Sequence, residues 1–192
     1  MKNSKEMVFA DSSTAMVNEQ SVDDLIAMGN AADTASVSFL KFSKNGQWLF
    51  GADEDTLEDG EVLYVNASTF VAGSILWADG KVQDQDVQPI SNRNALRQID
   101  GADAFLGVNF RTMEDGEDLQ FHPSSHGGKK FISKLMKAVG LGLKEHGVDK
   151  IAMVTLSNDS YKHQKFGKIY TPEFTLVGWA DSNGEAIKKL AA

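Results

Sequence analysis

The sequence predicts a mainly β fold of the α+β kind with one main helix. Three observations support this prediction. Short segments rich in β-branched and aromatic residues recur between Val37 and Phe121, separated by turn residues. The two β-rich segments near the C-terminus, 151–156 and 169–179, come after a stretch with a different period. In that stretch the apolar residues recur every four positions, as on one face of a helix, at Phe131, Leu135, Val139 and Leu143.

The composition is that of an ordinary globular protein. The chain has 192 residues, 42% of them hydrophobic and 24% charged, with a mean hydropathy of −0.27. This length suits one domain with a sizeable core. No apolar run is long enough to span a membrane, and the N-terminus lacks the apolar core of a secretory signal. Since there are no cysteines, disulfides, thiolate metal sites and cysteine nucleophiles are excluded, and we expect a cytoplasmic protein with no membrane partner.

The predicted organisation is one domain between two short terminal segments. Residues 1–35 are polar and predict a flexible N-terminal arm, with one short helix that Ser21 caps and that Asp23 and Asp24 favour near its positive end. Residues 36–180 form the single domain. Residues 181–192 predict a short C-terminal tail with a weak helix.

The strands of the domain can be placed in order. Segments 37–42 and 47–50 flank an Asn45-Gly46 turn and predict a hairpin, which an acidic loop follows over 52–60. A long β-rich region over 61–77 turns at 78–80 into an alternating strand, 81–87. Residues 89–101 predict a connecting loop or a short helix. Another hairpin is expected across 113–116, between strands at 104–111 and 118–121.

The C-terminal half predicts the helix and two strands. Ser124 or Ser125 is suited to the N-cap and Gly147 to the C-terminal stop. The continuous apolar run 151–156 predicts a buried central strand, and the alternating strand 169–179 contains Pro172 near its start. A polar loop, 157–168, is expected between them.

Strands, one helix and two further strands follow the order of a five-stranded OB barrel, whose helix lies between the third and fourth strands. We therefore predict an OB-like barrel in which residues 61–90 contain an inserted hairpin. Strands 2 and 3 would form its ligand face with two loops, the acidic loop 52–60 and the loop 157–168. An α+β sandwich is the competing architecture.

Charge is distributed unevenly along the chain. The net charge is −8. Residues 50–121 contain fifteen acidic and four basic residues, a net −11, whereas residues 122–170 contain nine lysines and three acidic residues, a net +6. One face can therefore be basic although the whole is acidic. The alternative is that both groups are only solvated surface.

The strongest candidate site is the basic and aromatic segment 161–170. Lysines neutralise phosphates and aromatic rings stack on bases, so this segment predicts binding of a single nucleic-acid strand; the alternative is a lysine-rich hairpin whose rings pack on the core. Its candidate residues are Tyr161, Lys162, His163, Lys165, Phe166, Lys168 and Tyr170.

Further candidates lie at the helix start and on predicted strands. Lys129 and Lys130 follow Gly127-Gly128, where a helix N-terminus favours an anion such as a backbone phosphate. The spacing is not that of a Walker A loop. Trp48 and Trp77 could offer stacking platforms, although either could instead be core.

The sequence does not favour catalysis or a metal. The four histidines lack metal-ligand spacing, and Asp53, Asp55 and Asp59 lack the glycine and glutamate of an EF-hand. Asp159, Ser160 and His163 share one loop without further signs of a triad. We therefore predict a protein that is not an enzyme, with no cofactor and no metal.

The segments SSHGGKK, VTLSNDSYKHQKFGKIYTPEF and LVGW, within residues 104–179, resemble those of small phage and prophage proteins. The ending also resembles phage single-stranded DNA-binding proteins of the OB type. This resemblance implies a non-enzymatic accessory protein of phage DNA replication or recombination, active in the host cytoplasm, with Lys162, Lys165, Phe166, Lys168 and Tyr170 as contacts. Many such proteins end in an acidic tail, whereas this sequence ends in AIKKLAA.

We therefore predict a protein that binds single-stranded DNA without sequence preference. Replication or recombination proteins are possible partners, and a homodimer is a possible state. The alternative is a phage-encoded protein-interaction module whose acidic face mimics nucleic acid or docks a basic host factor. A third hypothesis is an enzyme that uses the Gly-Gly-Lys-Lys loop on a phosphorylated ligand.

Overall fold

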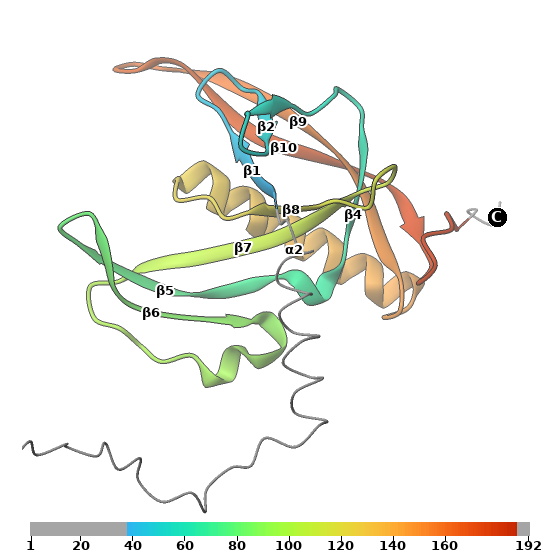
Figure 1. Cartoon of the computed structure of the whole chain (residues 1–192), viewed down its shortest axis with the longest axis horizontal. Coiled ribbons are helices and arrows are strands. Elements are labelled where there is room, and N and C mark those ends of the chain that lie inside the picture. The colour runs from blue at the N-terminus through green and yellow to red at the C-terminus, as the bar shows by residue number, and fades with distance from the viewer. Residues whose placement is uncertain (1–37, 188–192) are drawn as a thin grey trace, which may run out of the picture. The chain divides into compact units, whose positions relative to one another are not determined.

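The structure, a computed structural model, describes residues 38–187 (Figure 1). The predicted N-terminal arm with its short helix, and residues 188–192 of the tail, lie outside the described residues. The described residues belong to one compact unit. Their elements, in order, are β1 (Ser38–Phe42), β2 (Trp48–Phe50), β3 (Asp55–Thr56), β4 (Val62–Val65), the 3₁₀ helix η1 (Ala67–Thr69), β5 (Val71–Ala78), β6 (Lys81–Pro89), the 3₁₀ helix η2 (Ile90–Ala95), β7 (Asp103–Thr112), β8 (Asp118–Phe121), α2 (His126–His146), β9 (Ile151–His163) and β10 (Gly167–Ala180).

The strands form one curled, open sheet that resembles half of a barrel (Figure 1). Its order is β10-β9-β4-β7-β8-β1-β2-β3, antiparallel throughout except where β1 runs parallel to β8. One edge of β7 pairs with β4 and then with β5, which carries β6 as a hairpin. A mainly β fold with one main helix is thus confirmed for the described residues, whereas a five-stranded OB barrel stays a prediction.

Helix α2 covers the inner face of the curled sheet. Ser125 caps its N-terminus by accepting a hydrogen bond from the Gly128 amide at 3.1 Å. The helix ends at Gly147, whose φ of +111° suits glycine and whose amide donates to the Leu143 carbonyl at 3.1 Å. Both ends agree with the sequence prediction. The stripe that faces the sheet is buried and comprises Phe131, Ile132, Leu135 and Val139.

An aromatic cluster joins the helix to four strands. The Trp48 ring lies 5.0 Å from the Phe121 ring and 5.4 Å from the Phe131 ring, centroid to centroid. Phe131 in turn packs edge-on against Phe174 at 5.5 Å. The Trp48 indole N–H donates to the Ser157 carbonyl at 2.9 Å, so the buried ring also satisfies its polar atom. This cluster attaches β9 and β10 to the rest of the core.

Two predicted segments differ from the structure. Segment 157–168, expected to be a loop, consists mostly of strand, because β9 runs to His163 and β10 begins at Gly167. The weak helix expected in the tail is wrong for residues 181–187. The Asp181 carboxylate there accepts hydrogen bonds from the amides of Asn183 and Glu185, which forms a turn in place of a helix.

Candidate nucleic-acid interface

The long hairpin of β9 and β10 extends beyond its neighbours in the sheet. Strand β4 pairs with β9 only as far as Thr155, so residues 157–173 continue as a two-stranded ribbon (Figure 1). We call residues 157–173 the ribbon. Its register places Lys162 opposite Lys168 and Tyr161 opposite Ile169. The ribbon carries every candidate residue that the sequence predicted between 161 and 170.

A histidine side chain orders the ribbon tip. The Nδ1 atom of His163 accepts hydrogen bonds from the amides of Lys165 at 3.1 Å and Phe166 at 3.3 Å. The His163 and Phe166 rings are stacked with centroids 4.9 Å apart. Gly167 closes the turn with a φ of +73°, a value that favours glycine. The tip therefore holds the Phe166 ring in a defined position although 66% of Phe166 is exposed.

The ribbon presents different groups on its two faces. Tyr161 is 51% exposed and lies on the outer face of the sheet beside Ile169. Lys162, Lys168 and Tyr170 lie on the inner face, since side chains alternate along a strand. Tyr170 is half-buried, and the Lys168 Nζ atom lies 4.4 Å from its ring centroid, a cation–π contact. Tyr161 and Phe166 are therefore the exposed, or open, rings of the ribbon, although the His163 ring stacks on Phe166 and the Lys165 Nζ atom lies 5.4 Å from its centroid.

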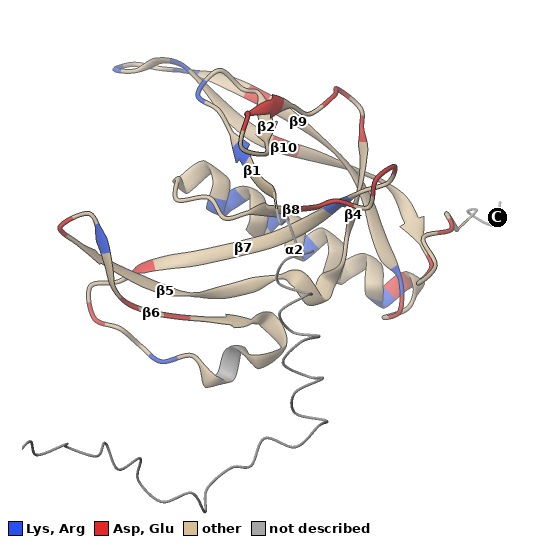
Figure 2. Cartoon of the chain, viewed as in Figure 1, with Lys and Arg blue, Asp and Glu red and all other residues tan. Residues whose placement is uncertain are grey.

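The ribbon lysines carry charge that no carboxylate neutralises. No acidic residue occurs from 160 to 172, and among the described residues none of Lys162, Lys165 and Lys168 forms an ion pair within 4.0 Å. Figure 2 shows Lys and Arg at the ribbon tip and Asp and Glu mainly on other loops. Other cationic side chains are paired at 2.5 to 2.8 Å, namely Lys41, Arg97, Arg111, Lys134 and Lys150.

The structure brings the start of α2 next to the root of the ribbon. A Cβ built on Gly127 would lie 3.9 Å from side-chain atoms of Thr171 and Pro172. Two helical turns further on, Lys134 pairs with Glu173 at 2.7 Å. Lys129 is half-buried and Lys130 exposed at this end of the helix. The two basic segments predicted from the sequence therefore lie on neighbouring parts of the molecule.

The two predicted tryptophan platforms differ in position. Only 5% of Trp48 is exposed, and its ring is enclosed by the aromatic cluster described above. Its ring is not accessible to a base in this structure, which corrects the prediction for Trp48. Trp77 is 57% exposed at the end of the β5–β6 hairpin, on a different part of the sheet from the ribbon.

A groove beside the ribbon root was not predicted from the sequence. It lies between the β1–β2 turn, the loop 56–59 and the inner face of the ribbon, with a volume of about 520 Å³. Asn158 donates to the Gly46 carbonyl at 2.9 Å across it, and the Tyr170 ring lies against Gly46. The groove joins residues more than 100 positions apart, so no local motif signals it.

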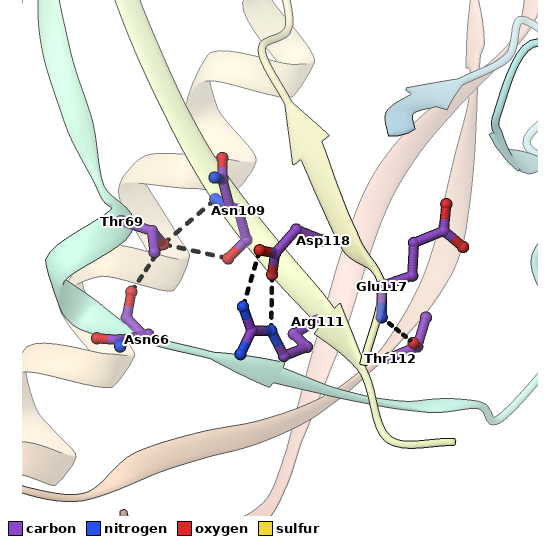
Figure 3. A network of polar contacts seen from close by, with 7 residues as sticks. All are labelled: Asn66, Thr69, Asn109, Arg111, Thr112, Glu117 and Asp118. Atoms are coloured by element: carbon purple, nitrogen blue, oxygen red, sulfur yellow. Dashed lines mark hydrogen bonds and ion pairs between the residues drawn. The ribbon is translucent and has the colours of Figure 1, made fainter. Parts of the chain in front are cut away.

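A polar network fastens the outer face of the sheet (Figure 3). Arg111 holds Asp118 through two hydrogen bonds of 2.8 Å, which lower the pKa of Asp118 and raise that of Arg111. The Thr69 hydroxyl donates to the Asn109 carbonyl at 3.1 Å and links η1 to β7. A pocket of about 300 Å³ lies beside these residues and Tyr64. Because the only guanidinium in it is neutralised, the pocket is not suited to phosphate.

The acidic residues gather around two loops. Residues 58–61 and 113–117 line a common hollow, although they are far apart in the sequence. Burial, followed by the charges of Glu58, Glu114 and Asp115, raises the pKa of Glu61. In residues 38–187, no three His, Asp or Glu side chains are placed to hold a metal ion. Six of the fifteen acidic residues counted between 50 and 121 therefore share one surface, which we call the acidic face: Glu58, Asp59, Glu61, Glu114, Asp115 and Glu117.

Comparisons with protein-family models, curated proteins and solved structures found no match to this chain. Over residues 38–187, none of the helical structure is long and apolar enough to cross a membrane.

Proposed function

We propose that the protein binds single-stranded DNA without strong sequence preference, and that the ribbon is its contact surface. The observation that carries this proposal is the ribbon itself: three unpaired lysines and two exposed aromatic rings on one projecting hairpin. Cationic side chains that follow the phosphates and rings that stack on bases are the two parts such binding requires. Lys129 and Lys130, beside the ribbon root, extend the cationic surface.

Each residue has a role in this mechanism. Lys162, Lys165 and Lys168 neutralise consecutive phosphates and release counterions. Tyr161 and Phe166 stack on bases, while His163 orders the tip and Tyr170 supports Lys168. No bond is made or broken, so the proposed activity is binding alone.

The finer fold and the biological role belong to the same proposal. The sheet is curled, and the helix precedes the two strands of the ribbon, an order consistent with an OB-like barrel that has gained the β5–β6 hairpin. We extend the proposal to an accessory role in phage-type DNA replication or recombination, with proteins of those processes as partners and a homodimer as a possible assembly.

A second candidate function uses the acidic face. The convergence of residues 58–61 and 113–117 favours a surface that docks a basic protein or mimics nucleic acid. Neutralising the ribbon lysines separates the two candidates. It abolishes DNA binding under the first and leaves the binding of a basic partner intact under the second.

The deciding experiment is a fluorescence-anisotropy titration with a labelled 20-nucleotide oligo-dT and a duplex of matched length, at 50 and 200 mM salt. We expect tighter binding to the single strand and a lower affinity at the higher salt, because bound phosphates release counterions. A labelled lysine-rich peptide serves as the probe for the second candidate. No binding to either DNA at 50 mM salt would overturn the proposed function.

A further inference from the structure

The groove at the ribbon root contains carboxylates beside a cationic surface. Glu58 and Asp59 line the groove from one side, and Tyr170 and Asn158 line it from the ribbon. Both carboxylate side chains are exposed, and neither forms an ion pair within 4.0 Å among the described residues. A phosphate entering this groove would meet like charge, so its chemistry suits a different part of a nucleotide.

The other lining groups are suited to the edge of a base. Asn45 and Gln47 are exposed and contribute side-chain amides, which can both donate and accept hydrogen bonds. Asn158 uses its N–H on the Gly46 carbonyl, which leaves its side-chain oxygen as an acceptor. Together with Glu58 and Asp59, these groups make the groove richer in acceptors than in donors. Its volume of about 520 Å³ falls within the range of small-molecule sites.

The groove lies where a strand held by the ribbon would pass. Tyr170 forms part of its wall and also contacts the Lys168 ammonium at 4.4 Å, and Lys168 is paired across the ribbon with Lys162. Lys44, two residues before Gly46 in the β1–β2 turn, is also exposed. A backbone bound by these lysines can therefore direct a base into the groove while its phosphates stay outside.

We propose that this groove holds one base of the bound strand and selects bases that carry an exocyclic amino group over thymine. This inference rests on the proposed function. Glu58 and Asp59 accept hydrogen bonds from the amino group of cytosine or adenine, which thymine lacks. The ribbon then supplies affinity for any strand, and the groove adds a preference at one position.

The test compares the affinities for 20-nucleotide oligo-dC and oligo-dT at pH 7.5 and 100 mM salt by anisotropy. We expect oligo-dC to bind about fivefold or more tightly. In the double variant Glu58→Gln and Asp59→Asn, the new amides can donate to thymine, so the preference should disappear or reverse. The matched control, Glu114→Gln with Asp115→Asn, removes the same charge from the neighbouring acidic loop and should keep the preference.

The outcomes separate this inference from the proposed function. Equal affinities of the unmodified protein for the two oligonucleotides would overturn the proposed base selection by the groove. The proposed binding of single strands would remain intact. A preference that survives in the Glu58 and Asp59 variant, or that the control also loses, would equally overturn it. Failure to bind either oligonucleotide would overturn the proposed function, and the inference with it.

Discussion

Two long hairpins project from the sheet, and each exposes an aromatic ring near its end. The ribbon carries Phe166 and the β5–β6 hairpin carries Trp77, at 66% and 57% exposure. Their charges differ in sign. The ribbon, residues 157–173, has three lysines and two acidic residues, Asp159 and Glu173, a net charge of +1, whereas residues 71–89 have one lysine and three aspartates, a net charge of −2. Both hairpins therefore expose an aromatic ring. The charge near the ring differs, and it favours the ribbon over the β5–β6 hairpin as a surface for nucleic acid.

The two hairpins are also held by different interactions. Arg97 is held against β6 by two hydrogen bonds to Asp84, of 2.9 and 2.6 Å, which lower the pKa of Asp84. The ribbon is held at its root by the Gly46 turn, through Asn158 and the ring of Tyr170. The positive charge of Arg97 is thus neutralised by the β5–β6 hairpin. The contacts that hold the ribbon do not involve its lysines, whose charges remain available.

The largest expected effect follows from neutralising the ribbon. Replacing Lys162, Lys165 and Lys168 together by Gln should weaken binding to oligo-dT by about 100-fold or more at 50 mM salt, because three phosphate contacts are lost. The slope of log K against log salt should become shallower by about 2. Anisotropy titrations at four salt concentrations measure both quantities.

The matched control replaces three exposed lysines outside the ribbon, Lys81, Lys137 and Lys144, by Gln. The net charge changes equally in the two triple variants. If the ribbon is the binding surface, the control variant should therefore retain most of its affinity for oligo-dT. Equal losses in the two triple variants would show that only total charge matters and would remove the distinction between the hairpins.

The next effect concerns the open rings of the ribbon. Phe166→Ala should cost about 1–3 kcal/mol of binding free energy if the ring stacks on a base, and Tyr161→Ala a similar amount. Phe39→Ala is the control, because Phe39 is 67% exposed, about as much as Phe166, yet lies on β1. An unchanged affinity for oligo-dT in both ribbon variants would reduce the ribbon to an electrostatic surface.

Local signals made much of this architecture predictable. Helix α2 begins after Ser125, one of the two serines that the sequence offered as N-cap, and ends at Gly147 as predicted, because caps and apolar spacing depend on neighbouring residues. The Asn45-Gly46 turn and the charge pattern of 161–170 are also local. The mainly β class followed from the same alternation and turn residues, although the half-barrel closure of the sheet did not.

Features that depend on contacts distant in sequence were missed or misplaced. Trp48 lies on a strand. The alternation of apolar residues alone does not reveal that the Trp48 side chain points into the core, against Phe121 and Phe131. The groove combines the β1–β2 turn, the loop 56–59 and the ribbon, which only the folded chain brings together. Segment 157–168 was polar enough to suggest a loop, but β9 and β10 pair along it without needing an apolar face.

The stability of the two hairpins can be compared through two glycines, one in the β1–β2 turn that contacts the ribbon and one in the β5–β6 turn. Gly46, at the ribbon root, has a φ of +82°, and Gly80, at the β5–β6 turn, has a φ of +72°. An alanine at either position adds about 1–2 kcal/mol of backbone strain. At Gly46 the new Cβ would also lie 2.5 Å from the Tyr170 ring, whereas at Gly80 it meets nothing within 4 Å. Urea unfolding should therefore show a clearly larger loss for Gly46→Ala, and equal losses would mean that Tyr170 does not anchor the ribbon.

The smallest expected effect is that of Trp77→Ala on DNA binding. The ring is exposed, and the sequence alone predicts it as a stacking platform, but Asp79 adjoins the hairpin turn and Asp84 and Asp86 lie on the paired strand. These carboxylates repel a phosphate backbone, so we expect the affinity for oligo-dT to change by less than about threefold.

A second variant tests the role of the charge directly: Asp79→Asn with Asp86→Asn, in which Trp77 is kept. If the sign of the charge is what separates the hairpins, that variant should gain affinity, and a further Trp77→Ala change should then remove the gain. A loss from Trp77→Ala as large as that from Phe166→Ala in the unmodified protein would instead place both hairpins in one binding surface.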